Sequence, residues 1–299
     1  MWTKRFEAFV APARTKPQIW RLAAGLVLVV AVYAGCVVAL LGLVWAIAGT
    51  EALQGWMQRI AQAGTPTAVL IMLASFIGML IGPILAARWL HKRPGRTLLG
   101  PRLWAGFGLG AAITGLVFAA NMLLIPAPFP LVPNTPLDLF LTFLPAALLG
   151  IALQTGAEEV LFRGYLQQQL AARFASPVVW MLLPSLAFGG LHYAPAMAGQ
   201  NAWLLVAAAT LFGLVAADLT RVTGSIGAAW GIHFVNNATA ILFIALDGSL
   251  SGMSLFKTPF TAADTDILRP LIAQDMLVTV IIWACIRLWL ARRDRTAPA

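Results

Sequence analysis

Charged residues are scarce in this chain, and cysteine is scarcer still. Lys, Arg, Asp and Glu make up 10% of the 299 residues, against about 25% in an ordinary soluble domain. The two cysteines, Cys36 and Cys285, both lie in apolar runs, so neither a disulfide framework nor a cysteine-rich metal site is available. No internal repeat or low-complexity segment is visible. These absences exclude a soluble globular protein and a protein built on disulfides.

The chain is instead rich in apolar residues, which make up 60% of it and give a mean hydropathy of +0.84. Apolar runs near 20 residues are long enough to cross a bilayer as helices. We therefore expect an all-α membrane protein with about eight transmembrane helices. The expected spans are 19–48, 67–90, 103–125, 137 to beyond 157, 177–193, 202–220, 226–247 and 270–290.

The basic residues predict the orientation of these helices. All of them except Arg59, Lys257 and Arg269 fall on one side of the expected topology, and Lys and Arg are retained on the cytoplasmic side. Both termini are therefore expected to be cytoplasmic. The net charge of +9 then reflects orientation and contact with anionic lipids. It does not indicate nucleic acid, because the basic residues neither gather on one face nor alternate with aromatics.

Three segments are expected along the chain. Residues 1–136 hold the first three helices and end in a proline-rich loop, residues 137–247 hold helices four to seven, and residues 248–299 hold an outer loop, the eighth helix and a basic tail. The polar residues that suit chemistry lie in the middle segment. The abundance of Ala and Arg over Lys is typical of a bacterial protein, so we expect the plasma (inner) membrane of a bacterium.

Three sets of polar or aromatic residues stand out in the middle segment. They are Glu158 and Glu159 with Arg163, Phe188 with His192, and His233 with Asn237. Residues four apart share one face of a helix. A charged side chain at the centre of a membrane helix costs roughly 2.5 to 3.5 kcal/mol on insertion scales, so paired carboxylates there point to function.

The expected chemistry is the hydrolysis of a bond by activated water. If helices four and five form an antiparallel hairpin that turns near residues 175–177, Glu158 faces His192. A carboxylate or a neutral imidazole can deprotonate water, and His and Asn can hold a developing oxyanion. Simpler interpretations stay open: Glu159 and Arg163 as a plain ion pair, or single histidines as hydrogen-bonding residues between helices. Asn236 is an alternative to its neighbour as the inward residue, and His91, in a basic loop, is expected to face solvent or lipid headgroups.

The three motifs, in this order on separate helices, resemble the type II CAAX prenyl endopeptidases, also called CPBP intramembrane proteases, a family with lysostaphin-resistance-protein-A-like members. The resemblance covers about residues 149–246. It implies an all-helical core whose polar cavity admits a peptide tail. Carried over to this sequence, it implies that Glu158 and His192 activate the water and that His233 and Asn237 stabilise the oxyanion. Glu159 would assist.

Arg163 would orient the carboxylates in such an enzyme, and Phe188 is expected to pack behind the histidine that follows it. The resemblance leaves two forms of catalysis open. Water activated without a metal is favoured, because there is no His-Glu-x-x-His sequence. The alternative is a divalent ion such as Zn²⁺, for which the possible ligands are Glu158, Glu159, His192 and His233.

The sequence therefore predicts an intramembrane endopeptidase that cuts near the C-terminal tail of a membrane-associated protein, either prenylated or unmodified. Two other classes stay open. A non-proteolytic immunity or scaffold protein would use the polar residues to hold a partner. A transporter would use them to relay protons or bind a cation, although the acidic and histidine residues of the three motifs lie in one half of the chain and not in two matching halves.

Overall fold

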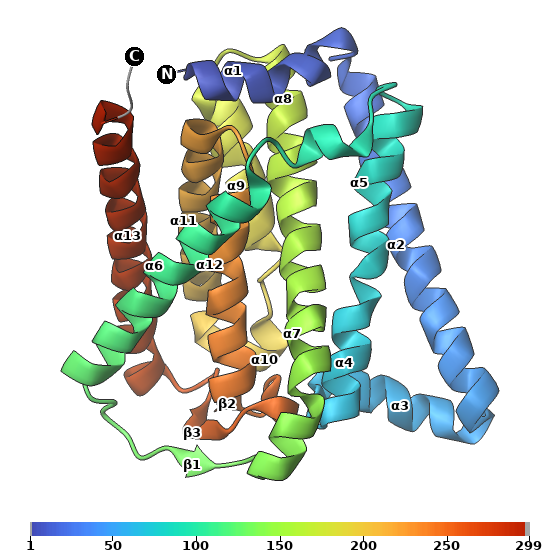
Figure 1. The fold of residues 1–299 in the computed structure, drawn as a ribbon. Helices are drawn as coiled ribbons and strands as arrows, with labels where there is room; N and C mark the ends of the chain where they lie inside the picture. The colour runs from blue at the N-terminus through green and yellow to red at the C-terminus, as the bar shows by residue number, and fades with distance from the viewer. Residues whose placement is uncertain (1, 297–299) are drawn as a thin grey trace.

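The structure is a computed structural model that describes residues 2–296 and is all-helical apart from one small sheet. Helices run between two ends of a bundle (Figure 1). One end, the terminal end, holds α1 and α8, and the other, the sheet end, holds α3, α10 and the three strands. The first half contains α1 (Lys4–Val10), η1 (Ala11–Thr15), α2 (Ile19–Ala48), α3 (Thr50–Gln62), α4 (Pro66–Ser75), α5 (Ile77–Trp89), η2 (Gly95–Leu98), α6 (Leu103–Leu124) and β1 (Val132–Pro133).

The second half carries the predicted site. Its elements are α7 (Leu137–Glu159), η3 (Val160–Gln167), α8 (Gln168–Arg173), η4 (Val178–Leu182), α9 (Leu183–Gly190), α10 (Pro195–Ala198), η5 (Gly199–Asn201), α11 (Ala202–Thr223), α12 (Gly227–Ala238), η6 (Thr239–Phe243), β2 (Ile244–Asp247), η7 (Ser251–Met253), β3 (Phe256–Thr261) and α13 (Thr265–Thr296). The segments η3, η4 and η6 are π-helical. π-Helical turns are rare in proteins as a whole, and those that occur often lie at functional sites.

Six helical segments in residues 2–296, not eight, are long and apolar enough to cross a membrane. They are Ile19–Ala48, Pro66–Trp89, Gly95–Leu124, Leu137–Arg173, Pro195–Thr223 and Thr265–Arg295. The expected fifth span is the short apolar helix Val178–Gly190. The expected seventh span is helical only as far as Phe243, where the chain becomes a strand. The hydropathy pattern merged this helix and strand into one span because both are apolar. A short apolar run does not by itself distinguish a helix from a strand.

The strand that ends the expected seventh span belongs to a three-stranded sheet of order β1-β3-β2. β1 pairs with β3 in the antiparallel sense, with Val132 opposite Lys257, and β2 pairs with β3 in the parallel sense, with Ile244 opposite Phe256. The sheet joins the proline-rich loop after α6 to the loop before α13. It thereby closes the sheet end of the bundle.

Close packing of α12 against α6 fixes the helix that carries two predicted site residues. A Cβ atom added at Gly110 would lie 2.3 Å from the carbonyl oxygen of Ala228, and one at Gly231 would lie 2.2 Å from that of Phe107. Only glycine permits this approach. Small residues that let backbones meet are the usual device for helix association in membranes.

The two described ends of the chain meet at the terminal end of the bundle (Figure 1). A guanidinium nitrogen of Arg5 in α1 lies 2.7 Å from a carboxylate oxygen of Asp294 in α13. In the same region His91 is 1% exposed, so its expected place in solvent or among headgroups is wrong. Its Nδ1 donates to the carbonyl oxygen of Lys16, and its Nε2 accepts from the hydroxyl of Tyr165. The loop after α5 is folded against the bundle, which accounts for this burial.

Candidate active site

The first motif lies at the junction of α7 and the π-helical segment η3, where its two glutamates have different environments. Glu159 is fully buried, and its Oε1 accepts a hydrogen bond of 2.9 Å from Nη1 of Arg163. Arg163 is itself 2% exposed and directs Nη2 to the carbonyl oxygen of Gly213 at 3.4 Å. The Glu158 side chain is 13% exposed. Glu159 is thus sealed in an ion pair, and Glu158 is accessible.

His233 of α12 lies between the two carboxylates. Its Nδ1 is 2.9 Å from Oε1 of Glu159, and its Nε2 is 3.2 Å from Oε2 of Glu158. The structure therefore joins Glu158, Glu159, Arg163 and His233 in one buried cluster. The second contact has the distance of an ion pair without the geometry of a hydrogen bond, since Oε2 of Glu158 has no hydrogen-bond partner among the described residues. Oε2 of Glu159 is likewise buried without one.

Aromatic rings surround this polar cluster. The Arg163 guanidinium carbon lies 4.8 Å from the centre of the Phe188 ring, and Phe188 meets His233 edge to face at 5.8 Å. The ring of Phe212 lies 4.8 Å from that of His233 on α12. Because the rings exclude water, charges inside the cluster interact more strongly than they would at a surface. Phe188 packs between the two histidines of the predicted site, as well as behind His192.

The spacing of four residues predicted that Phe188 and His192 lie on the same helix, but His192 lies beyond its end. α9 ends at Gly190, and His192 follows in a turn whose backbone N–H donates to the carbonyl oxygen of Gly189 at 2.9 Å. The two rings still meet at 4.8 Å. Nδ1 of His192 is 2.9 Å from the Phe188 carbonyl oxygen, which can only accept, so Nδ1 carries a proton. In the neutral ring, Nε2 therefore presents its lone pair.

The exposed ring of His192 makes no hydrogen bond or ion pair to Glu158 in the part of the chain from residue 2 to residue 296. The link between them passes through Phe188 and His233. The predicted hairpin is present, since η3 and α8 end at Arg173 and η4 begins at Val178.

Asn237 is bound to α7 by a residue that the sequence motifs did not single out. Its Nδ2 donates to Oε1 of Gln154 at 2.8 Å, and its Oδ1 accepts from Nδ2 of Asn236 at 3.3 Å. A second such residue, Thr155, accepts a hydrogen bond of 3.1 Å from Nε1 of Trp230. A signal was present in the sequence, because Gln154 lies one helical turn before Glu158 in an otherwise apolar run.

These contacts form a polar ladder between α7 and α12. Its three rungs are Thr155 with Trp230, Glu158 and Glu159 with His233, and Gln154 with Asn237. Each rung joins a residue of one helix to a residue of the other. The ladder therefore holds the carboxylates, the imidazole and the amide in one fixed arrangement.

The four possible zinc ligands do not form a ligand set. Among residues 2–296 no group of three or more His, Cys, Asp or Glu side chains is placed to hold a metal ion. Nδ1 of His233 faces a carboxylate and Nδ1 of His192 faces a carbonyl oxygen, so only their Nε2 atoms could ligate a metal. The two glutamates and two histidines are not gathered into a zinc ligand set in this arrangement.

The polar ladder, Phe188 and His192 all lie within one region of the chain that matches a known family. Residues 139–239 match the family described as Type II CAAX prenyl endopeptidase Rce1-like. This region of the chain is therefore similar to an Rce1-like domain. It is also 33% identical over 181 residues to the uncharacterized protein YyaK of Bacillus subtilis (strain 168), a match that covers 57% of this chain and 59% of that relative. The chain thus spans less than two thirds of this curated relative's length. No solved structure matches.

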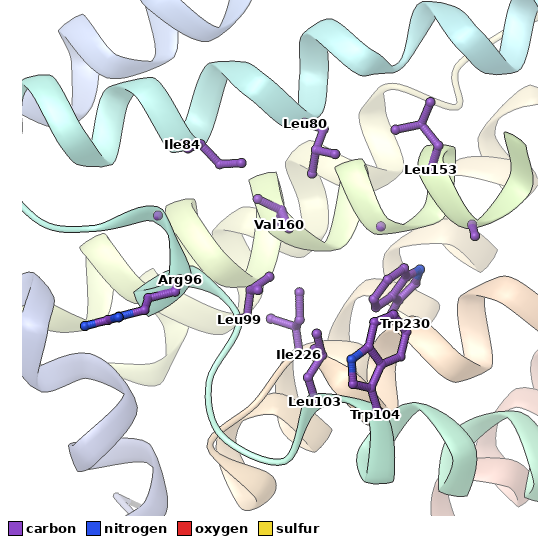
Figure 2. A pocket seen from close by; sticks show the side chains of 13 residues that line it. Leu80, Ile84, Arg96, Leu99, Leu103, Trp104, Leu153, Val160, Ile226 and Trp230 are labelled. Atoms are coloured by element: carbon purple, nitrogen blue, oxygen red, sulfur yellow. The ribbon is translucent and has the colours of Figure 1, made fainter. Parts of the chain in front are cut away.

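The region that matches this family shares an apolar cavity of about 680 Å³ with the helices that precede it. Leu153 and Val160 of α7 and η3 line it together with Leu80 and Ile84 of α5 (Figure 2), and Gly156 is also part of the lining. The remaining lining residues are Gly95, Arg96, Leu99, Leu103, Trp104, Ala152, Ile226 and Trp230. Trp230 therefore belongs both to the lining of the apolar cavity and to the polar ladder.

Proposed function

We propose that this protein is an intramembrane endopeptidase that hydrolyses a peptide bond near the C-terminal tail of a membrane-associated protein. The observation that carries the proposal is the unequal exposure of two adjacent carboxylates. Glu158 is accessible and rests against His233, whereas Glu159 is buried against Arg163. The Glu158 carboxylate is free to accept and donate a proton, and the Glu159 carboxylate holds the charges of Arg163 and His233 in place.

In the proposed reaction Glu158 is the general base. Its Oε2 is turned to His233, and its other oxygen takes a proton from water as the water oxygen bonds to the peptide carbonyl carbon. His192, whose Nε2 presents a lone pair, accepts the second hydrogen of that water in a hydrogen bond. The resulting oxyanion accepts a hydrogen bond from the second N–H of Asn237, whose first N–H is held by Gln154. Glu158 then donates its proton to the leaving nitrogen as the C–N bond breaks.

His233 and Glu159 are positioning groups in this scheme. His233 spans both carboxylates, so it fixes the direction of Glu158. Arg163 supplies the positive charge that makes the burial of Glu159 tolerable. These proposed roles of Glu158, Glu159, Arg163 and His192 are the ones that the family resemblance implied. The proposed role of His233 differs, because the resemblance implied that it stabilises the oxyanion.

The apolar cavity supports a substrate with an apolar tail. Its volume lies within the 300 to 1,000 Å³, roughly, of ligand pockets in general, and its lining is apolar apart from Arg96. We infer that a prenyl group or an apolar peptide segment occupies it while the peptide bond meets the ladder. Trp230, common to both, would be the point of contact between tail and scissile segment.

We further infer that the terminal end of the bundle faces the cytoplasm of a bacterial cell. Arg59, Lys257 and Arg269, the three basic residues set apart in the sequence, belong to α3, β3 and the start of α13. These elements meet at the sheet end (Figure 1). Retention of basic residues on the cytoplasmic side then places both termini there.

The test compares membrane-proteome peptide termini between cells that express the wild-type chain and cells that express Glu158→Gln at equal abundance. Glu51→Gln, a change in the exposed first turn of α3, is the matched control. We expect new termini with the wild type and the control and none with Glu158→Gln. Identical termini in all three strains would refute proteolysis. A cellular phenotype preserved in Glu158→Gln would then favour the immunity or scaffold function.

A further inference from the structure

A second cavity, of about 310 Å³, lies on the far side of α12 from the apolar one, between α6, η6 and α13. Each helical segment presents residues spaced three and four apart, which is one face of a helix. The lining residues are Phe118, Asn121, Met122, Asn236, Thr239, Ala240, Ile244, Leu271, Gln274, Asp275 and Val278. Five of these side chains are polar, in helices that are otherwise apolar.

Three polar side chains around this cavity each use a hydrogen as a donor and keep an acceptor oxygen. Gln274 donates through Nε2 to Oδ1 of Asn121 at 3.1 Å, Asn236 donates through Nδ2 to Asn237, and Thr239 donates to the carbonyl oxygen of Val235 at 2.9 Å. The side-chain oxygens of Gln274, Asn236 and Thr239 retain free lone pairs. The cavity therefore offers three neutral acceptor oxygens beside the carboxylate of Asp275.

Asp275 is the one ionisable residue of this lining. It lies inside the candidate span Thr265–Arg295 and makes no hydrogen bond or ion pair with any residue from 2 to 296. Asp218, a carboxylate of α11 that faces α13, shows how such a group is usually satisfied. It accepts from Arg221, Arg287 and Trp283. An intramembrane carboxylate without such partners indicates a binding function.

The cavity continues toward the sheet end of the bundle. A neighbouring cavity of about 290 Å³ shares five lining residues with it and is bounded by the proline-rich loop after α6. The shared residues are Asn121, Met122, Ile244, Leu271 and Gln274. A small polar solute can thus approach Asp275 from the side of the molecule that carries the sheet.

We propose that Asp275, with the oxygens of Asn236, Thr239 and Gln274, binds a monovalent cation. Acceptor oxygens around one carboxylate suit an alkali ion or an ammonium group. One unit of positive charge neutralises Asp275, whereas a divalent ion would leave a net charge in a medium of low dielectric, which is costly. The bound ion would stiffen the interface behind Asn237 through Asn236. This inference does not depend on proteolysis.

The experiment measures thermal unfolding of the full chain in phosphatidylcholine nanodiscs by tryptophan fluorescence. NaCl, KCl and NH₄Cl are titrated against choline chloride at constant ionic strength, for the wild type, Asp275→Asn and Asp266→Asn. Asp266, in the first turn of α13, is outside the cavity and is the matched control. We expect a saturable rise in melting temperature with at least one monovalent ion. Its half-effect concentration should rise at least about tenfold in Asp275→Asn, equivalent to about 1.4 kcal/mol, and stay unchanged in Asp266→Asn.

Three outcomes would overturn the proposal. One is a wild-type melting temperature that none of the salts raises above its value in choline chloride. Another is an equal rise in Asp275→Asn, which would show an unspecific salt effect. The third is a rise with CaCl₂ or MgCl₂, titrated in the same way, and with none of the monovalent salts. If Asp275→Asn does not fold, Thr239→Val removes one oxygen ligand and should raise the half-effect concentration in the same way.

Discussion

The two adjacent glutamates should respond differently to the same substitution. Glu159→Gln removes the negative charge that faces the Arg163 guanidinium and His233, each at 2.9 Å in a fully buried site. Breaking a buried pair by removing one partner costs about 3 to 5 kcal/mol. Glu158 is 13% exposed with one contact at 3.2 Å, so Glu158→Gln should cost about 1 kcal/mol. The expected effects on stability thus differ severalfold.

The assay compares melting temperatures of the purified variants in nanodiscs, together with cleavage of a peptide found by the terminus comparison. Glu159→Gln should melt on the order of 10 °C lower than the wild type. Glu158→Gln should melt within a few degrees of it and lose cleavage by about 10² to 10⁴-fold, the usual contribution of a general base. Equal melting temperatures for the two variants would refute the assignment of Glu159 as the buried, charge-holding residue. Full cleavage by Glu158→Gln would refute the assignment of the base.

Three further substitutions test the supports of the site. Gln154→Leu should slow peptide cleavage about five- to tenfold, because the Asn237 amide loses an acceptor worth about 1 kcal/mol, and Gln154→Glu, which keeps an acceptor, should restore most of the rate. Gly231→Ala should lower the free energy of unfolding by about 1 to 3 kcal/mol, since its Cβ meets a backbone oxygen at 2.2 Å, whereas Gly115→Ala, with nothing within 4 Å, should not. Burial lowers the pKa of His91 below its ordinary 6.5, so the unfolded chain binds more protons and stability should fall as pH drops through 6.5. In nanodisc melts between pH 7.5 and 5.5, His91→Gln should flatten this loss, and an unaltered pH dependence would contradict it.

Hydropathy identified six of the spans, because a helix of 20 apolar residues leaves a long and simple pattern. The predictions of a fifth and a seventh span were wrong for local reasons. α9 stops at Gly190, ahead of the turn that holds His192. The run from Gly227 onward ends as a strand at Ile244, which pairs with Phe256. Strand pairing depends on a partner distant in the sequence, so the apolar run alone did not reveal it.

Spacing predicted the contact of Glu159 with Arg163, since residues four apart meet on any helix. It did not predict that His233 would reach both glutamates, because that depends on the register of α12 against α7. The same register brings Gln154 to Asn237. A glutamine inside an apolar run is also common as a hydrogen-bonding residue between membrane helices, so its type alone did not mark it as part of the site.

The geometry of the site is determined largely by packing behind it. α12 meets α6 at glycine contacts that leave no room for a side chain, so His233 on its opposite face has no freedom to retreat from α7. Glu159, anchored by Arg163, holds the near nitrogen of that imidazole, and the far nitrogen is thereby aimed at Glu158. The accessible carboxylate is thus positioned by a chain of contacts that begins at the interface of α12 with α6. A buried ion pair is weak evidence for stability alone, and in the proposed mechanism this one serves to orient Glu158 through His233.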